Sequence, residues 1–198
     1  MADIIDTLAQ IEPGSALDQI RRDRQQAREN AQRSFEVLFD PADPGTFPLA
    51  ERYAVAAYTV TLQASESPAA AFYTELLEDE ISSKLAAAVA ELAARDRRPG
   101  PYGEYKETGL AAESEPGPTV AYTPDQRPAV IDERLAAALE HAHLLSLHPR
   151  DAEAGHLRRL EAAGWSADDI VTLSQLISFL SFQIRVVDGL LALKRARS

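Results

Sequence analysis

The sequence predicts an all-α protein, and three observations support this fold class. Alanine and leucine dominate the 198 residues, while β-branched and aromatic residues are few. Alanine and leucine favour helices, whereas β-branched and aromatic residues favour strands. Apolar residues recur every three or four positions over long stretches, as on the buried face of a helix. Proline and glycine gather between these stretches, where helices must end.

The composition limits both the domain organisation and the partners. With 198 residues, 45% of them hydrophobic, the chain can form one domain with a real core or two small halves. Its formal net charge of −11 argues against nucleic acid or an anionic membrane as a partner. No cysteine is present, which excludes disulfides and zinc–thiolate sites. Residues 1–14 lack the pattern of a signal peptide, and no apolar run approaches the roughly 20 residues of a membrane span, so we expect a soluble cytoplasmic protein.

Two helices and a loop are expected before residue 49. A short helix is predicted over 3–10. Ser15, with Asp18 three residues later, can cap a second helix that reaches about Phe39. Residues 40–48 hold three prolines and a glycine and should form a loop.

The second of these helices is rich in arginine. Its arginines are Arg21, Arg22, Arg24, Arg28 and Arg33. One interpretation is a solvated face whose charges are balanced by Asp23 and Glu29. The alternative is a docking face for an acidic partner.

A helix–elbow–helix unit follows. The apolar run 49–62 predicts the first helix, and the short break Ala64–Pro68 forms the elbow. A second helix is predicted from Pro68 to about Arg97, because proline is favourable in the first turn. The residues expected on its buried side are Phe72, Leu76, Leu77, Ile81, Leu85, Val89 and Leu92.

The longest irregular stretch is 98–128, with six of the twelve prolines and four of the nine glycines. It divides a single domain, 1–198, into halves 1–97 and 129–198. Connectors this long are often functional or mobile. Its tyrosines are Tyr102, Tyr105 and Tyr122. They could cover a pocket as a lid, or they could fix a long connector to the surface.

The helix expected over 130–147 carries two histidines, His141 and His143, and His148 follows it. A metal site would need a further ligand, such as His156 or Glu140. Side chains two apart on a helix point in different directions, so this spacing is not a metal signature. We therefore expect surface or half-buried histidines and no metal or other cofactor.

Two more helices complete the chain, over 150–163 and 166–196, with Trp165 filling the junction between them. The last helix has two neighbouring apolar stripes, which predict burial on more than one side, in a core or across a subunit contact. The first stripe is Ile170, Leu173, Ile177, Leu180, Ile184, Val187 and Leu191, and the second is Leu176, Phe179, Val186, Leu190 and Leu193. Arg185 and Asp188 interrupt the stripes and are expected to pair.

The elbow segment, PLAERYAVAAYTVTLQASESPAAAFYTELL over 48–77, resembles the core of the carboxymuconolactone decarboxylase and alkylhydroperoxidase-D (AhpD-like) superfamily. Family members begin the first helix with an acidic "ERE" and carry "NGCxYCxxxH" at the elbow. On that pattern Glu51 and Tyr53 occupy the acidic positions. The two cysteine positions and the histidine position fall on Ser65, Pro68 and Phe72.

The second half strengthens the resemblance. Residues 162–166, AAGWS, and Arg185 followed by 188–190, DGL, fit the end of peroxidase-related members of the superfamily. The match covers roughly 20–97 and 130–195 and is closest to members without the cysteine pair. It implies an AhpD-like helical bundle and a homo-oligomer, either a dimer, a trimer or a hexamer.

The resemblance also shows which chemistry is missing. A cysteine at a helix N-terminus is activated to a thiolate, and a second cysteine three residues later can resolve the oxidised first one. Ser65 and Pro68 can do neither, because a serine hydroxyl does not ionise near neutral pH and proline has no reactive group. The chain should therefore not act as a peroxidase on its own.

Three hypotheses follow. In the first, the chain is a structural, binding or regulatory relative in peroxide defence, and in one version of this hypothesis it pairs with a cysteine-bearing paralogue. In the second, it is an enzyme of the decarboxylase type that uses acid–base groups. The candidate groups are Glu51, Tyr53, Glu66, Tyr73 and His141. In the third, it is an unrelated helical bundle.

Overall fold

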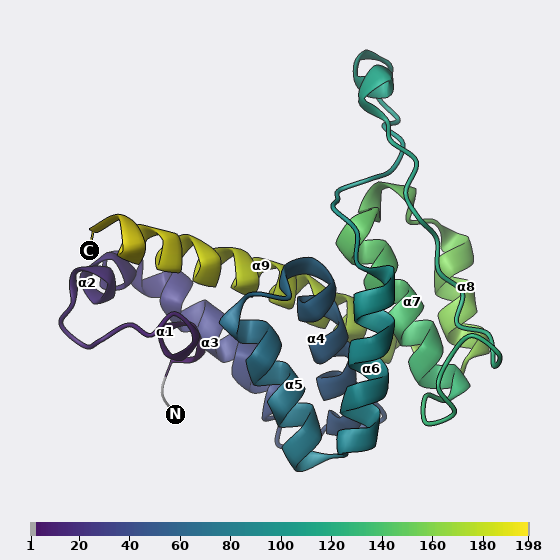
Figure 1. The fold of residues 1–198 in the computed structure, drawn as a ribbon, viewed down its shortest axis with the longest axis horizontal. Coiled ribbons are helices and arrows are strands. Elements are labelled where there is room, and N and C mark those ends of the chain that lie inside the picture. The colour runs from purple at the N-terminus through teal and green to yellow at the C-terminus, as the bar shows by residue number, and fades with distance from the viewer. Residues whose placement is uncertain (1–2, 198) are drawn as a thin grey trace.

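The computed structural model describes residues 3–197, and within this range the chain forms helices and no β-strand, as predicted. The elements are α1 (Ile4–Leu8), α2 (Ala16–Arg22), α3 (Gln25–Phe39), α4 (Leu49–Ala64), α5 (Pro68–Glu80), α6 (Ser83–Asp96), the 3-10 helix η1 (Thr108–Glu113), α7 (Glu133–Leu147), the 3-10 helix η2 (Pro149–Asp151), α8 (Ala154–Ala162) and α9 (Ala167–Arg197). Figure 1 shows their arrangement.

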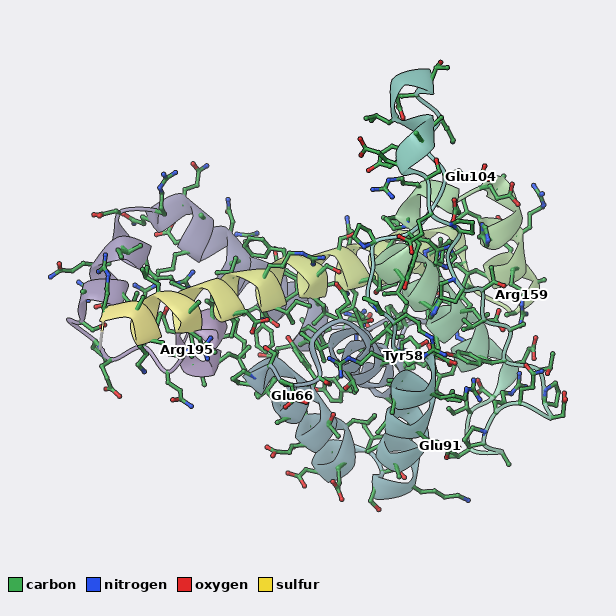
Figure 2. All side chains as sticks on the ribbon, turned by 45° about the horizontal axis from the view of Figure 1, so that its top comes forward. Tyr58, Glu66, Glu91, Glu104, Arg159 and Arg195 are labelled. Atoms are coloured by element: carbon green, nitrogen blue, oxygen red, sulfur yellow. The ribbon has the colours of Figure 1, made fainter. Side chains whose placement is uncertain are left out.

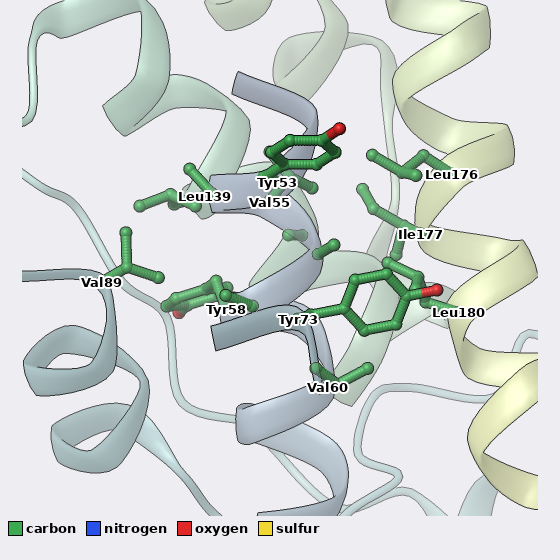
Figure 3. Packing of buried hydrophobic residues seen from close by; sticks show 14 of the residues in the cluster. Tyr53, Val55, Tyr58, Val60, Tyr73, Val89, Leu139, Leu176, Ile177 and Leu180 are labelled. Atoms are coloured by element: carbon green, nitrogen blue, oxygen red, sulfur yellow. The ribbon is translucent and has the colours of Figure 1, made fainter. Parts of the chain in front are cut away.

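The bundle is built around α4, which packs against α5, α6, α7 and α9. Residues 52–60 are buried without interruption. A helix that is apolar all round must be covered on every side, and the alanines at 54, 56 and 57 let neighbouring helices approach closely. Figure 3 shows Tyr58 and Val60 of α4 among side chains from neighbouring helices, including Leu139 and Leu180. Buried residues from both halves of the chain form one hydrophobic cluster.

The long helix α9 links two parts of this bundle. It packs against α4, α7 and α8, and also against α1 and α3 (Figure 1). The first predicted stripe is buried from Ile170 to Val187, and Leu191 is half-buried. The second stripe is buried at Leu176 and Phe179 and half-buried beyond them. This helix therefore has apolar neighbours on more than one side, as its sequence predicted.

Helix α9 also corrects the expectation that no apolar stretch of the chain approaches the length of a membrane span. By length and composition α9 could span a bilayer, since an 18-residue window has a mean hydropathy of 1.7. The signal is weak, because 44% of that window is buried inside the protein and core helices pass the same test.

The arginine-rich segment forms two helices rather than one, and its break lies at Asp23 and Arg24. The turn brings arginines on both sides of the break to the same carboxylates. The Arg21 guanidinium donates to Asp3 at 2.6 Å and to Asp6 at 2.8 Å. Arg28 pairs with Asp3 and Asp6 too, and its guanidinium donates to Asp18 at 3.1 Å.

This ion cluster corrects the interpretation of a solvated face for Arg21 and Arg28, whereas Arg22, Arg24 and Arg33 are exposed as expected. Arg21 is only 8% exposed and Asp18 only 2%. The charges of Arg21, Arg22 and Arg28 are balanced by Asp3, Asp6 and Asp18 and not by the acids that the helical spacing suggested. The guanidiniums of Arg22 and Arg28, with the Gly14 amide, hold the pKa of Asp18 well below its usual range.

The helix predicted from Pro68 to Arg97 is also two helices, α5 and α6, separated at Ile81 and Ser82. The Ser82 hydroxyl accepts a hydrogen bond from the Leu85 amide at 3.3 Å and so caps α6. The break lets both helices pack against α4. Ile81, expected to be buried, lies in the turn and is 40% exposed.

The connector between the halves has one part that is buried in the bundle and another that projects from it. Tyr122 is fully buried, and its hydroxyl lies 2.5 Å from that of Tyr58 and donates to Asp96 at 2.8 Å. Residues 103–116, in contrast, project from the bundle with η1 at their end (Figure 1). Tyr122 therefore fixes the connector to the body, and the projecting part does not cover the bundle as a lid would.

Candidate functional site

The elbow connects two helices that pack against each other, as the sequence predicted. Helix α4 ends at Ala64, whose carbonyl accepts a hydrogen bond from the Ser67 amide at 2.9 Å. Helix α5 starts at once with Pro68 in its first turn. Helix α4 also packs against α9. An unrelated helical bundle would not need this contact.

A polar network fixes the elbow to α7 and α9. The Gln63 amide nitrogen donates to the Ser146 hydroxyl at 3.1 Å and to the Ser181 hydroxyl at 2.8 Å. The Gln63 amide oxygen accepts from the Arg185 guanidinium at 3.2 Å. One side chain thus joins α4 to two helices of the second half of the chain.

The expected pair between Arg185 and Asp188 does not form. The Arg185 guanidinium donates to Gln63 and to the Ser181 carbonyl. Asp188 instead accepts from the Ser67 hydroxyl at 2.9 Å. Arg185 and Asp188 thus bond to the elbow and not to each other, because Gln63 offers an acceptor to Arg185 and Ser67 offers a donor to Asp188.

Beside this network lies a pocket of about 630 Å³, enclosed by the elbow, the start of the connector, α7 and α9. We call it the elbow pocket. Its charged lining residues are Arg97, Arg98, Arg185 and Asp188. Arg97 is exposed, and its guanidinium has no hydrogen bond or ion pair with any residue in the described range 3–197, although its carbonyl accepts from the Arg98 guanidinium at 2.7 Å. The elbow pocket is thus locally basic in a chain of net charge −11.

The three positions that match the family's reactive site hold a serine, a proline and a phenylalanine. The Ser65 hydroxyl is half-exposed, and its only hydrogen-bond partner within residues 3–197 is Glu66, at 3.4 Å. Pro68 is half-buried at the start of α5. Phe72 packs edge-on against Tyr73, with ring centroids 5.0 Å apart. None of these positions provides the thiol that the family pattern requires.

The acidic positions lie far from the elbow. Glu51 is at the opposite end of α4, about 20 Å from Ser65 along the helix. Its carboxylate accepts from the Arg134 guanidinium at 2.9 Å, and burial raises its pKa. Tyr53 is 8% exposed, and its ring stacks against that of Phe39. Neither side chain is positioned to relay a proton to the elbow.

The remaining acid–base candidates are not brought together either. Glu66 is exposed on the elbow (Figure 2). Tyr73 is fully buried, its hydroxyl donates to Gln183 at 2.8 Å, and burial raises its pKa. His141 Nε2 lies 3.1 Å from the Ser174 hydroxyl, away from the elbow pocket. The structure therefore does not bring the five candidate groups of the decarboxylase-type hypothesis together at the elbow.

All four histidines of the chain line one small cavity of about 80 Å³ between α7, α8 and the connector. His143 Nδ1 lies 3.4 Å from His148 Nε2, and His148 Nδ1 lies 3.2 Å from Asp151. His141, His143 and His148 are buried, which corrects the prediction of surface or half-buried histidines. Burial lowers the pKa of His141 and that of His143 to about 4, and both are neutral at pH 7.

This cavity does not form a metal centre in the described part of the chain. Among residues 3–197, no three His, Asp or Glu side chains come together as metal ligands. Two imidazole nitrogens, His141 Nδ1 and His143 Nε2, have no hydrogen-bond partner among these residues.

The residues that make the elbow pocket basic, and those that hold Gln63 beside it, were not predicted from the sequence. Arg97 is the last residue of the predicted second helix and Arg98 the first of the predicted irregular stretch, and neither was singled out as a binding residue. Ser146 and Ser181 are separated from Gln63 by 83 and 118 positions. No local pattern indicates such partners.

Comparisons with models of protein families, with curated proteins and with solved structures find no match.

Proposed function

We propose that this chain is a thiol-free relative of the AhpD-like proteins that binds a small anionic molecule in the elbow pocket. It does not reduce hydroperoxides by itself. The observation that supports this proposal best is the combination of a basic pocket with an elbow that carries no thiol. We infer a cytoplasmic role as an accessory or binding protein in peroxide defence, beside a cysteine-bearing paralogue.

The charges of the elbow pocket favour a carboxylate. Arg97 and Arg98 line one wall, and Arg185 lines the pocket from α9. The Arg98 guanidinium also donates to the Arg95 carbonyl at 3.0 Å and to the Arg97 carbonyl at 2.7 Å through one of its nitrogens, so its other N–H groups are the ones available to a ligand. Arginine presents two parallel N–H groups to a carboxylate or phosphate, which gives both strength and orientation. Asp188, the single acid of the lining, already accepts from Ser67. A volume of about 630 Å³ is within the range of small-molecule sites.

Binding can be tested with citrate as the probe and an uncharged triester of citrate as its control. We expect citrate, and not the ester, to raise the midpoint of thermal unfolding. Arg97→Gln with Arg98→Gln should weaken citrate binding about tenfold or more, since a hydrogen bond to a charged group contributes about 1.5–3 kcal/mol. Arg158→Gln is the matched control, because Arg158 is exposed on α8 and does not line the pocket. Equal binding by all variants would contradict the site.

The loss of thiol chemistry is tested separately. The purified chain should show no turnover of hydrogen peroxide or an alkyl hydroperoxide with dithiothreitol as reductant. Ser65→Cys with Pro68→Cys places two thiols where the family pattern has them, at the start of α5. If the elbow is a former dithiol site, this double variant gains turnover and each single variant gains less. Turnover by the unaltered chain would refute the proposal.

A further inference from the structure

A projecting arm, residues 103–116, is the most unusual surface feature of the molecule. Two extended segments run away from the bundle and carry η1 at their tip, as Figures 1 and 2 show. Every residue from 106 to 113 is exposed. The tip is apolar, with Leu110, Ala111 and Ala112 in sequence, and Leu110 is 38% exposed. The bundle to which the arm belongs does not cover this tip.

The base of the arm is held rigidly. Gly103 and Glu115 form an antiparallel backbone bridge, and the Glu104 amide donates to Asp151 at 3.0 Å. The Arg150 guanidinium lies 3.9 Å from the centre of the Tyr105 ring and donates to its hydroxyl at 2.6 Å. A preformed arm loses little conformational entropy when a partner binds, which favours binding through its tip.

Glycine is required at the two places where the arm joins the body. Gly103 has a φ of +110°, and a Cβ there would lie 3.1 Å from the Arg150 Cβ. A Cβ on Gly117 would lie 2.8 Å from the Tyr102 Cβ. The two segments thus leave the body through a gap that excludes side chains, and this fixes the direction of the arm.

Elsewhere on the molecule lies an apolar groove of about 860 Å³ between α3, α8 and α9. Val37, Leu157 and Val171 line it and are 59%, 45% and 56% exposed. They are three of the six large hydrophobic side chains that are exposed within residues 3–197. Exposed apolar side chains that gather in one groove mark a binding surface, whereas scattered ones do not.

The charges of the arm and the groove are complementary. The only charged residue that lines the groove is Arg33, whose guanidinium has no hydrogen bond or ion pair with any described residue from 3 to 197. The arm carries four glutamates against one lysine. The glutamates are Glu104, Glu107, Glu113 and Glu115. Copies of a chain with net charge −11 repel one another, so a groove whose one charged residue is an arginine is a favourable place for an acidic arm to approach.

We propose that the groove of one copy binds the arm tip of a second copy of this chain. Leu110 of the arm enters between Val37, Leu157 and Val171, and the glutamates of the arm face Arg33. The arm and the groove are different surfaces, so two copies either exchange arms reciprocally in a closed dimer or associate head to tail. This contact is independent of the elbow pocket and of its ligand.

Because the chain has no cysteine, the contact can be tested by disulfide trapping between engineered cysteines. Leu110→Cys and Val171→Cys are introduced into separate batches of full-length protein carrying different tags, which are mixed and oxidised. We expect a disulfide between the two tagged chains. Ile81→Cys is the matched control for Val171→Cys, because Ile81 is an exposed aliphatic residue, 40% exposed, and does not line the groove. The yield of disulfide between Ile81→Cys and Leu110→Cys should be lower than that between Val171→Cys and Leu110→Cys by about tenfold or more.

Light scattering after size exclusion gives the second readout. We expect a dimer or larger species whose association is weakened about tenfold or more by Leu110→Asp, at an unchanged helical content. Arg33→Glu should also weaken association, and Glu107→Arg with Glu113→Arg in the partner should restore part of it. A monomer at every concentration would overturn the proposal. So would a dimer that persists in Leu110→Asp, because it would show that another surface joins the copies.

Discussion

Acid should destabilise the fold through the buried histidines. His141 and His143 each have a pKa of about 4 in the folded protein against 6.5 when unperturbed. The neutral form is favoured on folding, so the unfolded chain binds more protons between pH 6.5 and pH 4. Stability is then fully present above pH 6.5 and is lost as the pH falls toward 4.

The magnitude follows from those two pKa values. Lowering the pH from 7.5 to 5.5 should remove about 1.3 kcal/mol of unfolding free energy for each of the two histidines. Together they contribute about 2.6 kcal/mol, a large part of a typical total of about 5–15 kcal/mol. Burial also lowers the pKa of His148, which acts in the same direction, whereas the raised pKa of the Glu51 carboxyl acts in the opposite one.

Urea unfolding at pH 7.5, 6.5 and 5.5 measures this effect in the unaltered chain and in His141→Gln and His143→Gln. Each variant should lose about 1.3 kcal/mol of the pH dependence, whatever its stability at pH 7.5. With only four histidines in the chain, NMR titration of the imidazoles can report the individual pKa values. A stability independent of pH over this range, or variants with an unaltered pH dependence, would refute the reasoning.

Two further predictions concern buried hydrogen bonds. Arg52 is 5% exposed and donates to the Phe47 and Leu38 carbonyls at 2.8 Å, so Arg52→Met should cost about 3 kcal/mol or more in urea unfolding by leaving carbonyls unsatisfied. Arg158→Met, at an exposed position, should change stability by about 0.5 kcal/mol at most. Tyr122→Phe removes the hydroxyl that contacts Tyr58 and Asp96, so it should cost about 1–3 kcal/mol and accelerate proteolysis within the connector; an unaltered cleavage rate would contradict its role as an anchor.

The sequence predicts the helices of this fold well, because their apolar periodicity is a local property. It predicts the interruptions at Asp23 and at Ile81 poorly, since helix-forming residues continue across both. The first break depends on ion pairs formed with α1, and the second lets α6 pack against α4. Ser82 was the one local signal for the second break, as a possible N-cap.

The candidate site could be predicted only in part. The elbow and the missing thiols follow from Ser65 and Pro68 directly. The hydrogen bonds of Gln63 to Ser146 and Ser181 depend on how distant helices pack, and no periodicity indicates them. The sequence does not predict the arm either. A stretch rich in proline and glycine indicates a loop, but not the direction in which the loop projects.

The most direct test of the central claim is an NMR titration of the isotope-labelled chain with citrate. We expect saturable shifts of backbone resonances at the elbow, at 97–101 and around Arg185, with little change near the histidine cavity. Shifts confined to another surface, or none at concentrations that saturate typical carboxylate sites, would contradict it.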